Sequence, residues 1–275
     1  MYQNVIQVYT DSMRQLPDDN LKYPVLVKDD KGNPIGSGVF ISVDKFVYFV
    51  TAKHVVFNNE TGILTHPAIG LLYYSKDADT TNEISIDTKA IIPHATSDVV
   101  VIRVGAKTAI PETKNYRLQF EKYVTVLNLS GILVNVSNEN LKLYEDIKIS
   151  NDIFLLGYPV SLANSRFINP LRPLLRKGIV AGKNDTLRVA VLDCPVYQGN
   201  SGCPVLEYEH VSVTRTEIKL IGIAIEFVPF VEITQSLYYK YKNSTIENSG
   251  YSILVPVDFI LELIKADIAT IKPSS

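Results

Sequence analysis

Short apolar runs alternate with turn-forming segments along most of this chain. Residues 39–41 and 46–51 are two β-branched and aromatic runs separated by residues 42–45, which is the pattern of a β-hairpin. The same rhythm predicts further strands at residues 23–28, 70–74, 83–93 and 99–104 in the first half and at residues 153–156, 175–181, 187–194, 204–208, 218–226 and 252–255 in the second half. Many short strands separated by turns favour β-barrels over a parallel sheet.

The pattern changes after Pro256. Apolar residues there recur at helical spacing, and a proline suits the first turn of a helix. The residues with this spacing are Val257, Ile260, Leu261, Leu263 and Ile264. We therefore predict a C-terminal helix packed against the second barrel.

These elements together predict an all-β fold of two six-stranded antiparallel β-barrels with a C-terminal α-helix. The N-terminal barrel is expected within residues 1–115. Residues 116–255 are expected to hold a connector, an added hairpin and the C-terminal barrel, and residues 256–275 the helix and a tail.

The composition is that of an ordinary globular protein, with 46% hydrophobic and 20% charged residues. The formal net charge of −2 gives no basic surface of the kind that neutralises phosphates, so nucleic acid is not expected as a partner. Cys194 and Cys203 are too few for a disulfide framework, and we treat both as reduced thiols.

Two segments bear on the cellular compartment. Residues 1–16 lack both a basic leader and a continuous apolar core, so no signal peptide is expected. The most apolar late run, residues 220–231, contains Glu226 and Pro229 and is shorter than the roughly 20 residues that cross a bilayer. We therefore expect no membrane span and a cytoplasmic protein.

The most informative motif follows the predicted strand at residues 187–194. Ser201 there lies between Gly199 and Gly202, so a tight turn can present its hydroxyl. The backbone amides of Gly199 and Ser201 can point at one spot, as the oxyanion hole of an acyl-transfer enzyme requires. Ser201 is therefore the candidate nucleophile.

A serine hydroxyl needs a base to take its proton and a carboxylate to orient that base. His54 follows one predicted strand end, and Asp98 leads another strand. The order His, Asp, Ser along the chain is one of the three orders described for such triads. The sequence thus predicts a triad of His54, Asp98 and Ser201.

Each of these residues also has a structural interpretation. Ser201 could be a turn serine, His54 a capping residue and Asp98 a hydrogen-bond acceptor at a strand end. The histidines at positions 66, 94 and 210 are alternative bases in less suitable contexts. Cys203 is next to Pro204 beyond the turn apex and is expected to be a small buried residue rather than a nucleophile.

Taken together, six motifs resemble a trypsin-like serine peptidase of the chymotrypsin clan, closest in style to the bacterial HtrA-type proteases. The matching segments are Gly-Ser-Gly-Val-Phe-Ile at 36–41, Val-Thr-Ala-Lys-His-Val-Val at 50–56, Ser-Asp-Val-Val-Val-Ile at 97–102, Gly-Tyr-Pro at 157–159, Gly-Asn-Ser-Gly-Cys-Pro at 199–204 and Ile-Leu-Val-Pro-Val at 253–257. The resemblance implies a double β-barrel with the triad in the cleft between the barrels and a bacterial source.

The chain departs from that resemblance at two places. Asn200 stands where secreted trypsins have an aspartate that pairs with a newly cut N-terminus, so activation by that ion pair is not expected. No peptide-binding PDZ domain is expected after the helix, which puts HtrA-type tethering in doubt.

By the same resemblance, two segments wall the pocket for the substrate side chain. The candidate substrate-binding residues are Pro195, Val196, Gln198, Ile225, Glu226 and Phe227. Pro195, Val196 and Ile225 favour an apolar or small side chain, and Phe227 could narrow the pocket. Glu226 would attract a basic side chain if it points inward, but alternation along the strand could equally turn it to solvent.

The chain is therefore expected to be a serine endopeptidase that cleaves proteins or peptides through an acyl-enzyme, with no cofactor and no metal. A catalytically silent pseudo-protease or peptide-binding module is the alternative. A non-peptide esterase would share every one of these residues. The sequence identifies no regulatory partner.

Overall fold

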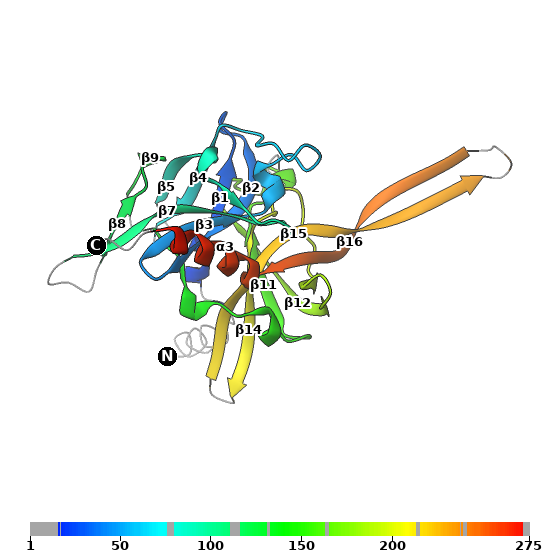
Figure 1. The fold of residues 1–275 in the computed structure, drawn as a ribbon. Helices are drawn as coiled ribbons and strands as arrows, with labels where there is room; N and C mark the ends of the chain where they lie inside the picture. The colour runs from blue at the N-terminus through cyan, green and yellow to red at the C-terminus, as the bar shows by residue number, and fades with distance from the viewer. Residues whose placement is uncertain are drawn as a thin grey trace, which may run out of the picture.

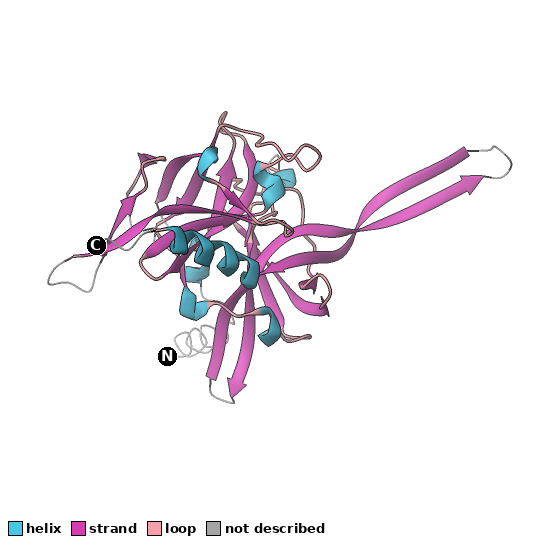
Figure 2. Cartoon of the chain, viewed as in Figure 1, coloured by secondary structure: helices cyan, strands magenta, loops and turns pink. Residues whose placement is uncertain are grey.

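The computed structural model describes residue 16 and residues 18–75, 80–110, 116–130, 133–162, 165–212, 215–236, 238 and 241–271. Two β-sheets form the body, and one helix near the C-terminal end of the chain packs across them (Figures 1 and 2). This arrangement confirms the predicted all-β class with a C-terminal helix. Residues 1–15, for which no signal peptide was expected, and the last residues of the tail lie outside the described residues.

The first sheet contains ten strands, and its main path runs β6-β7-β3-β2-β1-β4-β5-β9. These strands are β1 (Pro24–Lys28), β2 (Pro34–Val43), β3 (Phe46–Thr51), β4 (Ala68–Tyr74), β5 (Thr81–Asp87), β6 (Ile92–Pro93), β7 (Val100–Ala109), β8 (Tyr116–Phe120), β9 (Val124–Asn128) and β10 (Val136–Ser137). The predicted hairpin at residues 39–51 is the β2–β3 pair, with Val43 opposite Phe46.

The second sheet is a closed barrel in the order β11-β12-β13-β16-β15-β14. Its strands are β11 (Asp152–Gly157), β12 (Leu174–Asn184), β13 (Val189–Asp193), β14 (Pro204–Ser212), β15 (Arg215–Ser236) and β16 (Tyr241–Pro256). This barrel has the six strands that were expected. All its strand pairs are antiparallel, as was also expected.

The first sheet is larger than the six strands expected for two reasons: the segment after residue 115 adds three strands, and the single strand expected at residues 83–93 is divided into β5 and β6 by the turn η2. β8 pairs with β7, β9 pairs with β5, and β10 pairs with β2. The boundary expected at residues 115/116 therefore cuts through this sheet. The β10–β2 pair is parallel, so the first sheet is not purely antiparallel.

Two α-helices are described, α2 (Lys53–Val56) and α3 (Val257–Thr270). Short 3₁₀ turns are η1 (Asp18–Lys22), η2 (Thr88–Ala90), η3 (Asn138–Asn140), η4 (Tyr144–Asp146) and η5 (Val160–Leu162). The buried residues of α3 are the five apolar positions that predicted it. No helix in the described part of the chain is long and apolar enough to span a bilayer.

Helix α3 packs on both sheets rather than on the second barrel alone. The carboxylate of Asp267 accepts hydrogen bonds from the Tyr48 hydroxyl at 2.7 Å and from Nη1 of Arg103 at 2.9 Å. Tyr48 lies in β3 and Arg103 in β7, so these bonds tie the helix to the first sheet. The helix was expected to pack against the second barrel alone, and that expectation was wrong. The Tyr48 hydroxyl and the Arg103 guanidinium of the first sheet need the Asp267 carboxylate as a hydrogen-bond partner.

Strands β15 and β16 continue far beyond the barrel as a two-stranded arm (Figures 1 and 2). The sequence pattern predicted strands only at residues 218–226 and 252–255, whereas the ladder between the two strands runs on to the pair Ser236 and Tyr241. The signal was present only in part: Val231 and Ile233 alternate with the polar Glu232 and Thr234, but Phe230 before them interrupts the alternation.

Candidate active site

His54 lies in the single turn of α2, directly after strand β3. The carboxylate of Asp98 holds it at two points: Oδ1 accepts from the backbone amide of His54 at 3.0 Å, and Oδ2 lies 2.6 Å from Nδ1 of its ring. When Nδ1 carries the proton for this bond, Nε2 has a free lone pair. The structure thus orients the imidazole as a base whose acceptor atom faces away from Asp98.

Asp98 is set up to remain ionised. Burial alone would raise the pKa of its carboxyl group, but the hydrogen bonds from the His54 ring and backbone, together with the charge of that ring, hold the pKa below its ordinary value of 3.8. A carboxylate of this kind stabilises an imidazolium that forms beside it.

The turn that carries Ser201 depends on glycine at Gly202. This residue has φ +87°, and a Cβ built there would lie 2.2 Å from the Ser37 carbonyl oxygen and 2.9 Å from the Ala52 amide nitrogen. Ala52 is the N-cap of the helix that carries His54. The missing side chain therefore lets the turn around Ser201 lie directly against the segment that enters α2.

The Ser201 hydroxyl donates a hydrogen bond to the carbonyl oxygen of Ile225 at 2.9 Å. No hydrogen bond joins it to His54 among the described residues. Asp98 and Ile225 nevertheless line one cleft, with a volume of about 610 Å³. The structure therefore brings the three predicted residues to one region, with the serine rotamer turned toward β15.

Two backbone amides beside Ser201 are available for a ligand. The amides of Gly199 and Ser201 donate to no atom of the described residues, whereas the neighbouring amide of Asn200 is bonded to the Tyr197 carbonyl at 2.9 Å. The Gln198 carbonyl accepts from the Ser161 amide in η5, so it points toward that turn. Both donors expected for the oxyanion hole are thus unoccupied.

Ser37, which the sequence signals only as part of the Gly-Ser-Gly motif, holds the turn around Ser201 in place. Its buried hydroxyl donates to the Gly199 carbonyl at 2.7 Å and accepts from the Tyr158 amide at 3.0 Å. Its own amide donates to the Ser201 carbonyl at 2.9 Å. The contact between Ser37 and Gly199 joins residues 162 positions apart, so no local sequence pattern could have predicted it.

The sequence of residues 36–213 matches the family model described as the trypsin-like peptidase domain. This match covers well over half of the chain. The chain belongs to the trypsin-like peptidase domain family. Among curated proteins, no sequence matches this chain.

Solved structures share the trypsin-like fold. Human heparin binding protein has a TM-score of 0.53 at 10% identity, covering 95% of this chain and 98% of its own. The MamO protease domain from Magnetospirillum magneticum has a TM-score of 0.49 at 12% identity, with 90% and 98% covered. The serine endoprotease from Yersinia pestis has a TM-score of 0.46 at 15% identity, with 93% and 68% covered.

Within this trypsin-like domain, the predicted specificity residues lie in two segments. Val196 is buried, and its carbonyl accepts from the Asn248 side chain at 2.7 Å. The Pro195 carbonyl accepts from Arg176 at 3.2 Å. Gln198 is exposed at the end of this segment. The segment before the nucleophile turn is thus braced from two sides.

The second segment of predicted specificity residues lies in β15. Ile225 is buried and Glu226 is exposed, and both line the 610 Å³ cleft together with Asp98. Phe227 is 38% exposed at the root of the arm. A carboxylate at position 226 can therefore meet a ligand in this cleft.

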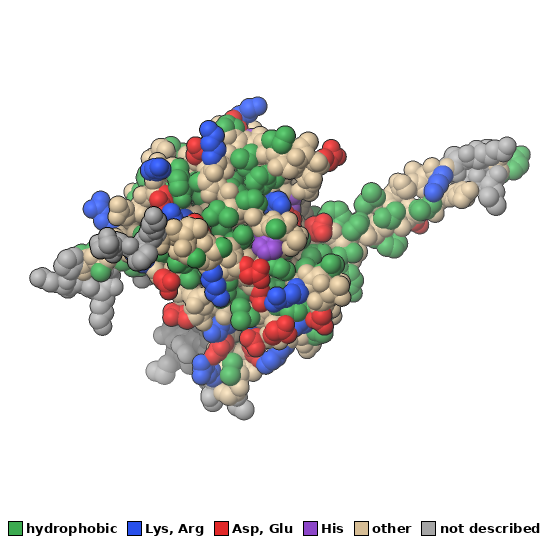
Figure 3. Space-filling model, viewed as in Figure 1, with side chains coloured by type: hydrophobic (Ala, Val, Ile, Leu, Met, Phe, Trp, Pro, Cys, Tyr) green, Lys and Arg blue, Asp and Glu red, His purple; other side chains and the backbone are tan. Residues whose placement is uncertain are grey.

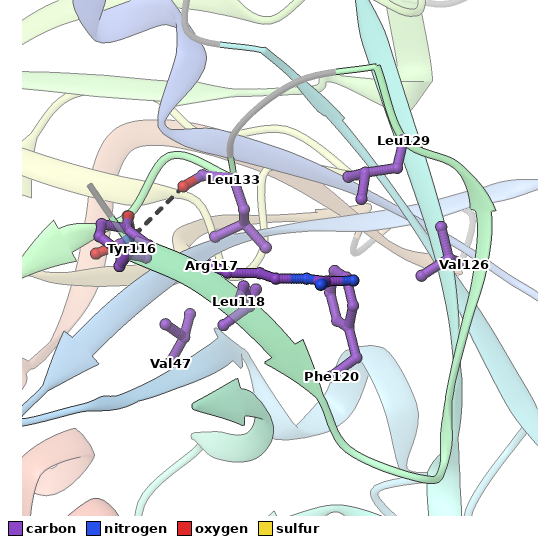
Figure 4. A pocket seen from close by; sticks show the side chains of 9 residues that line it. Val47, Tyr116, Arg117, Leu118, Phe120, Val126, Leu129 and Leu133 are labelled. Atoms are coloured by element: carbon purple, nitrogen blue, oxygen red, sulfur yellow. Dashed lines mark hydrogen bonds between the residues drawn. The ribbon is translucent and has the colours of Figure 1, made fainter. Parts of the chain in front are cut away.

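A separate cavity of about 420 Å³ lies between β8 and β9, where the Arg117 side chain extends among apolar neighbours (Figure 4). It contains none of the predicted site residues. Its lining residues are Val47, Tyr116, Arg117, Leu118, Phe120, Val126, Leu129, Leu133 and Asn135.

The other candidate nucleophile and bases are engaged elsewhere. His66 pairs with Asp30, and His94 pairs with Glu262. The rings of His210 and Tyr208 pack edge to face. Cys203 is fully buried, and burial raises the pKa of its thiol far above the ordinary value. No group of three or more potential metal ligands occurs within the described residues.

Proposed function

We propose that this chain is a serine endopeptidase that cleaves polypeptides through an acyl-enzyme. The observation that carries the proposal is the pair of Asp98 contacts to His54, 3.0 Å to its amide and 2.6 Å to its ring, next to a glycine-bounded serine. The two unoccupied amides of Gly199 and Ser201 support it further. Membership of the trypsin-like peptidase family supports the same reaction class.

The proposed reaction begins with rotation of the Ser201 hydroxyl from Ile225 toward Nε2 of His54. The imidazole takes the hydroxyl proton as the oxygen attacks the substrate carbonyl, and Asp98 stabilises the resulting imidazolium. The amides of Gly199 and Ser201 stabilise the oxyanion, each worth about 10² to 10³ in rate. His54 then returns the proton to the leaving amine, and water hydrolyses the acyl-enzyme by the reverse sequence.

Labelling with a fluorophosphonate tests the proposal. The wild-type protein is expected to label, and Ser201→Ala is expected not to label while remaining folded. His54→Ala should lower the labelling rate by several orders of magnitude, because the hydroxyl then lacks its base. Equal labelling of wild type and Ser201→Ala, or no labelling of the folded wild type, would reject the proposal. The wild type should also be labelled in cell lysate, where any activating factor is present.

One observation favours the alternative of a peptide-binding module. The Ser201 hydroxyl has its hydrogen bond with Ile225 and none with His54 among the described residues. If that rotamer persists with a peptide in the cleft, the fold binds without turnover. Peptide binding by the folded wild type, with neither labelling nor cleavage, would select this alternative.

A further inference from the structure

The strand that contacts the candidate nucleophile is also the strand that forms the arm. The Ile225 carbonyl of β15 holds the Ser201 hydroxyl, and β15 then runs outward to Ser236. We define the arm as residues 228–236 of β15 and 241–250 of β16. A chain lying along β15 at the site therefore continues directly onto the arm (Figure 1).

One face of the arm carries a run of three exposed aliphatic side chains. Val231 and Ile246 are cross-strand partners and are 51% and 68% exposed, and Ile233, on the same face, is 56% exposed. The opposite face carries Glu232 and Glu247, together with Phe230, which is the cross-strand partner of Glu247 and is 55% exposed. Exposed hydrophobic side chains follow the arm in the space-filling view (Figure 3). A strand with apolar side chains on one face and polar side chains on the other typically packs its apolar face against another polypeptide segment.

The arm also has an unpaired backbone edge. β15 pairs with β14 only as far as Ile223, and beyond that point β16 is its sole strand partner in the described part of the chain. A two-stranded hairpin is marginally stable in water, and a third strand adds support. An unpaired edge of this kind is a template for an added strand.

The root of the arm is joined to the candidate specificity segment. The Asn248 side chain donates to the Val196 carbonyl at 2.7 Å, and the Ser249 hydroxyl donates to the Val228 carbonyl at 2.6 Å. The ladder shifts register between Phe227 and Pro229, so a bulge sets the direction of the arm. These contacts hold the arm in a defined position relative to the site.

We propose that the arm binds substrate: an extended polypeptide adds as a strand to the free edge of β15, with the residues on the N-terminal side of the cleaved bond lying along the arm. This inference rests on the proposed endopeptidase function. Antiparallel pairing is the more stable arrangement, and it places the N-terminal side of the substrate outward. Nine residues at about 3.3 Å each give a contact about 30 Å long.

The side chains of the arm define the substrate class. Alternate substrate residues next to Val231 and Ile233 are apolar, and those next to Glu232 are polar or basic. Segments with this alternation are half-buried strands in folded proteins. The substrate is therefore an unfolded polypeptide that exposes such a segment N-terminal to the cleaved bond.

A second copy of this chain is the competing occupant. Two arms packed face to face would each cover a strip about 30 Å by 10 Å, or about 600 Å² in total. Stable interfaces require about 1,000 Å² or more. The arm is thus too narrow to hold a dimer by this face alone, whereas an added strand also gains backbone hydrogen bonds along the edge.

The test compares Val231→Thr/Ile233→Thr/Ile246→Thr with Thr234→Ser/Asn243→Ser/Thr245→Ser, a matched control on the opposite face. The long probe is reduced, carboxymethylated α-lactalbumin, and the short probes are a fluorophosphonate and a tetrapeptide library. We expect KM for the long probe to rise about tenfold or more in the apolar-face variant, with kcat within twofold. Labelling and tetrapeptide cleavage should stay at wild-type rates, and the control variant should match wild type throughout.

A ladder of peptides tests direction and reach. The bond of the long probe that is cleaved fastest is placed in peptides with 4, 8 or 12 residues on its N-terminal side. For wild type, KM should fall as the N-terminal side of the peptide lengthens. KM should not fall for the apolar-face variant. It should also not fall for a short-arm variant, in which Asn-Gly replaces residues 230–247. Extension on the C-terminal side should leave KM unchanged.

Binding is measured separately from turnover in a Ser201→Ala background, by fluorescence anisotropy of the 12-residue peptide. The apolar-face substitutions should weaken binding at least tenfold. Unchanged affinity and unchanged KM, with normal labelling, would overturn the inference and leave the proposed function intact. A dimer in light scattering that the apolar-face variant dissociates, with KM unaffected, would also overturn it. Absence of labelling would reject the proposed function, while the anisotropy result would still decide the role of the arm.

Discussion

The Ser201 hydroxyl donates to the Ile225 carbonyl at 2.9 Å, so the candidate nucleophile is bonded to the strand along which substrate is proposed to lie. The proposed reaction requires this hydroxyl to turn from Ile225 toward Nε2 of His54. Catalytic hydrogen bonds are often absent before substrate binds and form only in the complex. A peptide that pairs with β15 would compete for the Ile225 carbonyl and release the hydroxyl.

Asp98 should make stability depend on pH in the acid range. Its pKa in the folded protein lies below the ordinary value of 3.8, so the ionised carboxylate stabilises the fold above about that pH. This stabilisation is lost as the pH falls through the lower folded-state pKa. Wild type should therefore lose more stability than Asp98→Asn below pH 3.8, as measured by urea unfolding from pH 6 to pH 2.5.

Asp193→Asn is the matched control for this measurement, because Asp193 is an exposed carboxylate at the end of β13. Its unfolding free energy should follow wild type across the range. Parallel curves for wild type and Asp98→Asn would show that the contact with His54 does not stabilise the ionised form.

Ser37→Ala should impair both stability and the nucleophile turn. The substitution removes the donor to the Gly199 carbonyl and the acceptor of the Tyr158 amide at a fully buried position. Leaving such groups unpaired costs about 1–3 kcal/mol. Urea unfolding should show this loss, and the fluorophosphonate labelling rate should fall because Gly199 is no longer held.

Ser42→Ala serves as the comparison, since Ser42 is buried in the same strand but its side chain makes no hydrogen bond within the described residues. It should leave the labelling rate unchanged. Equal effects of the two substitutions would mean that the Ser37 hydroxyl has no positioning role.

Gly202→Ala should be severely destabilising, and Gly62→Ala should be mild. Both residues have positive φ, +87° and +66°, so both substitutions carry the cost of the left-handed conformation, about 1–2 kcal/mol. Only the Cβ at position 202 also meets backbone atoms, whereas nothing lies within 4 Å at position 62. Thermal unfolding should show a loss above about 3 kcal/mol for Gly202→Ala, and similar losses for the two variants would contradict the steric argument.

The two cysteines should resist alkylation in the folded protein. Cys194 and Cys203 are both free and buried, and burial raises the pKa of Cys194 to about 11. The thiolate is the reactive form, so iodoacetamide at pH 8 should modify neither residue. Mass spectrometry should show both modified only after denaturation. Ser201→Cys should add one reactive site under native conditions, and rapid modification of the folded wild type would show that these thiols are accessible.

Local patterns in the sequence determined much of this protein. The alternation around residues 39–51 predicted the β2–β3 hairpin, and the helical spacing after Pro256 predicted the buried face of α3. The glycines around Ser201, the strand end before His54 and the strand start after Asp98 pointed to the residues that the structure brings to one region. These features depend on backbone period and turn geometry, which neighbouring residues specify by themselves.

Only the tertiary structure decided which distant segments meet. β8 joins the first sheet because β7 offers it an edge, and α3 bridges both sheets because Asp267 bonds to Tyr48 and Arg103. Ser37 became a positioning residue through a contact across 162 positions, and the arm acquired its exposed apolar face by extending beyond any partner in the described part of the chain. Pairing of this kind depends on which edges and polar groups remain unsatisfied after folding, and one strand's sequence does not contain that information.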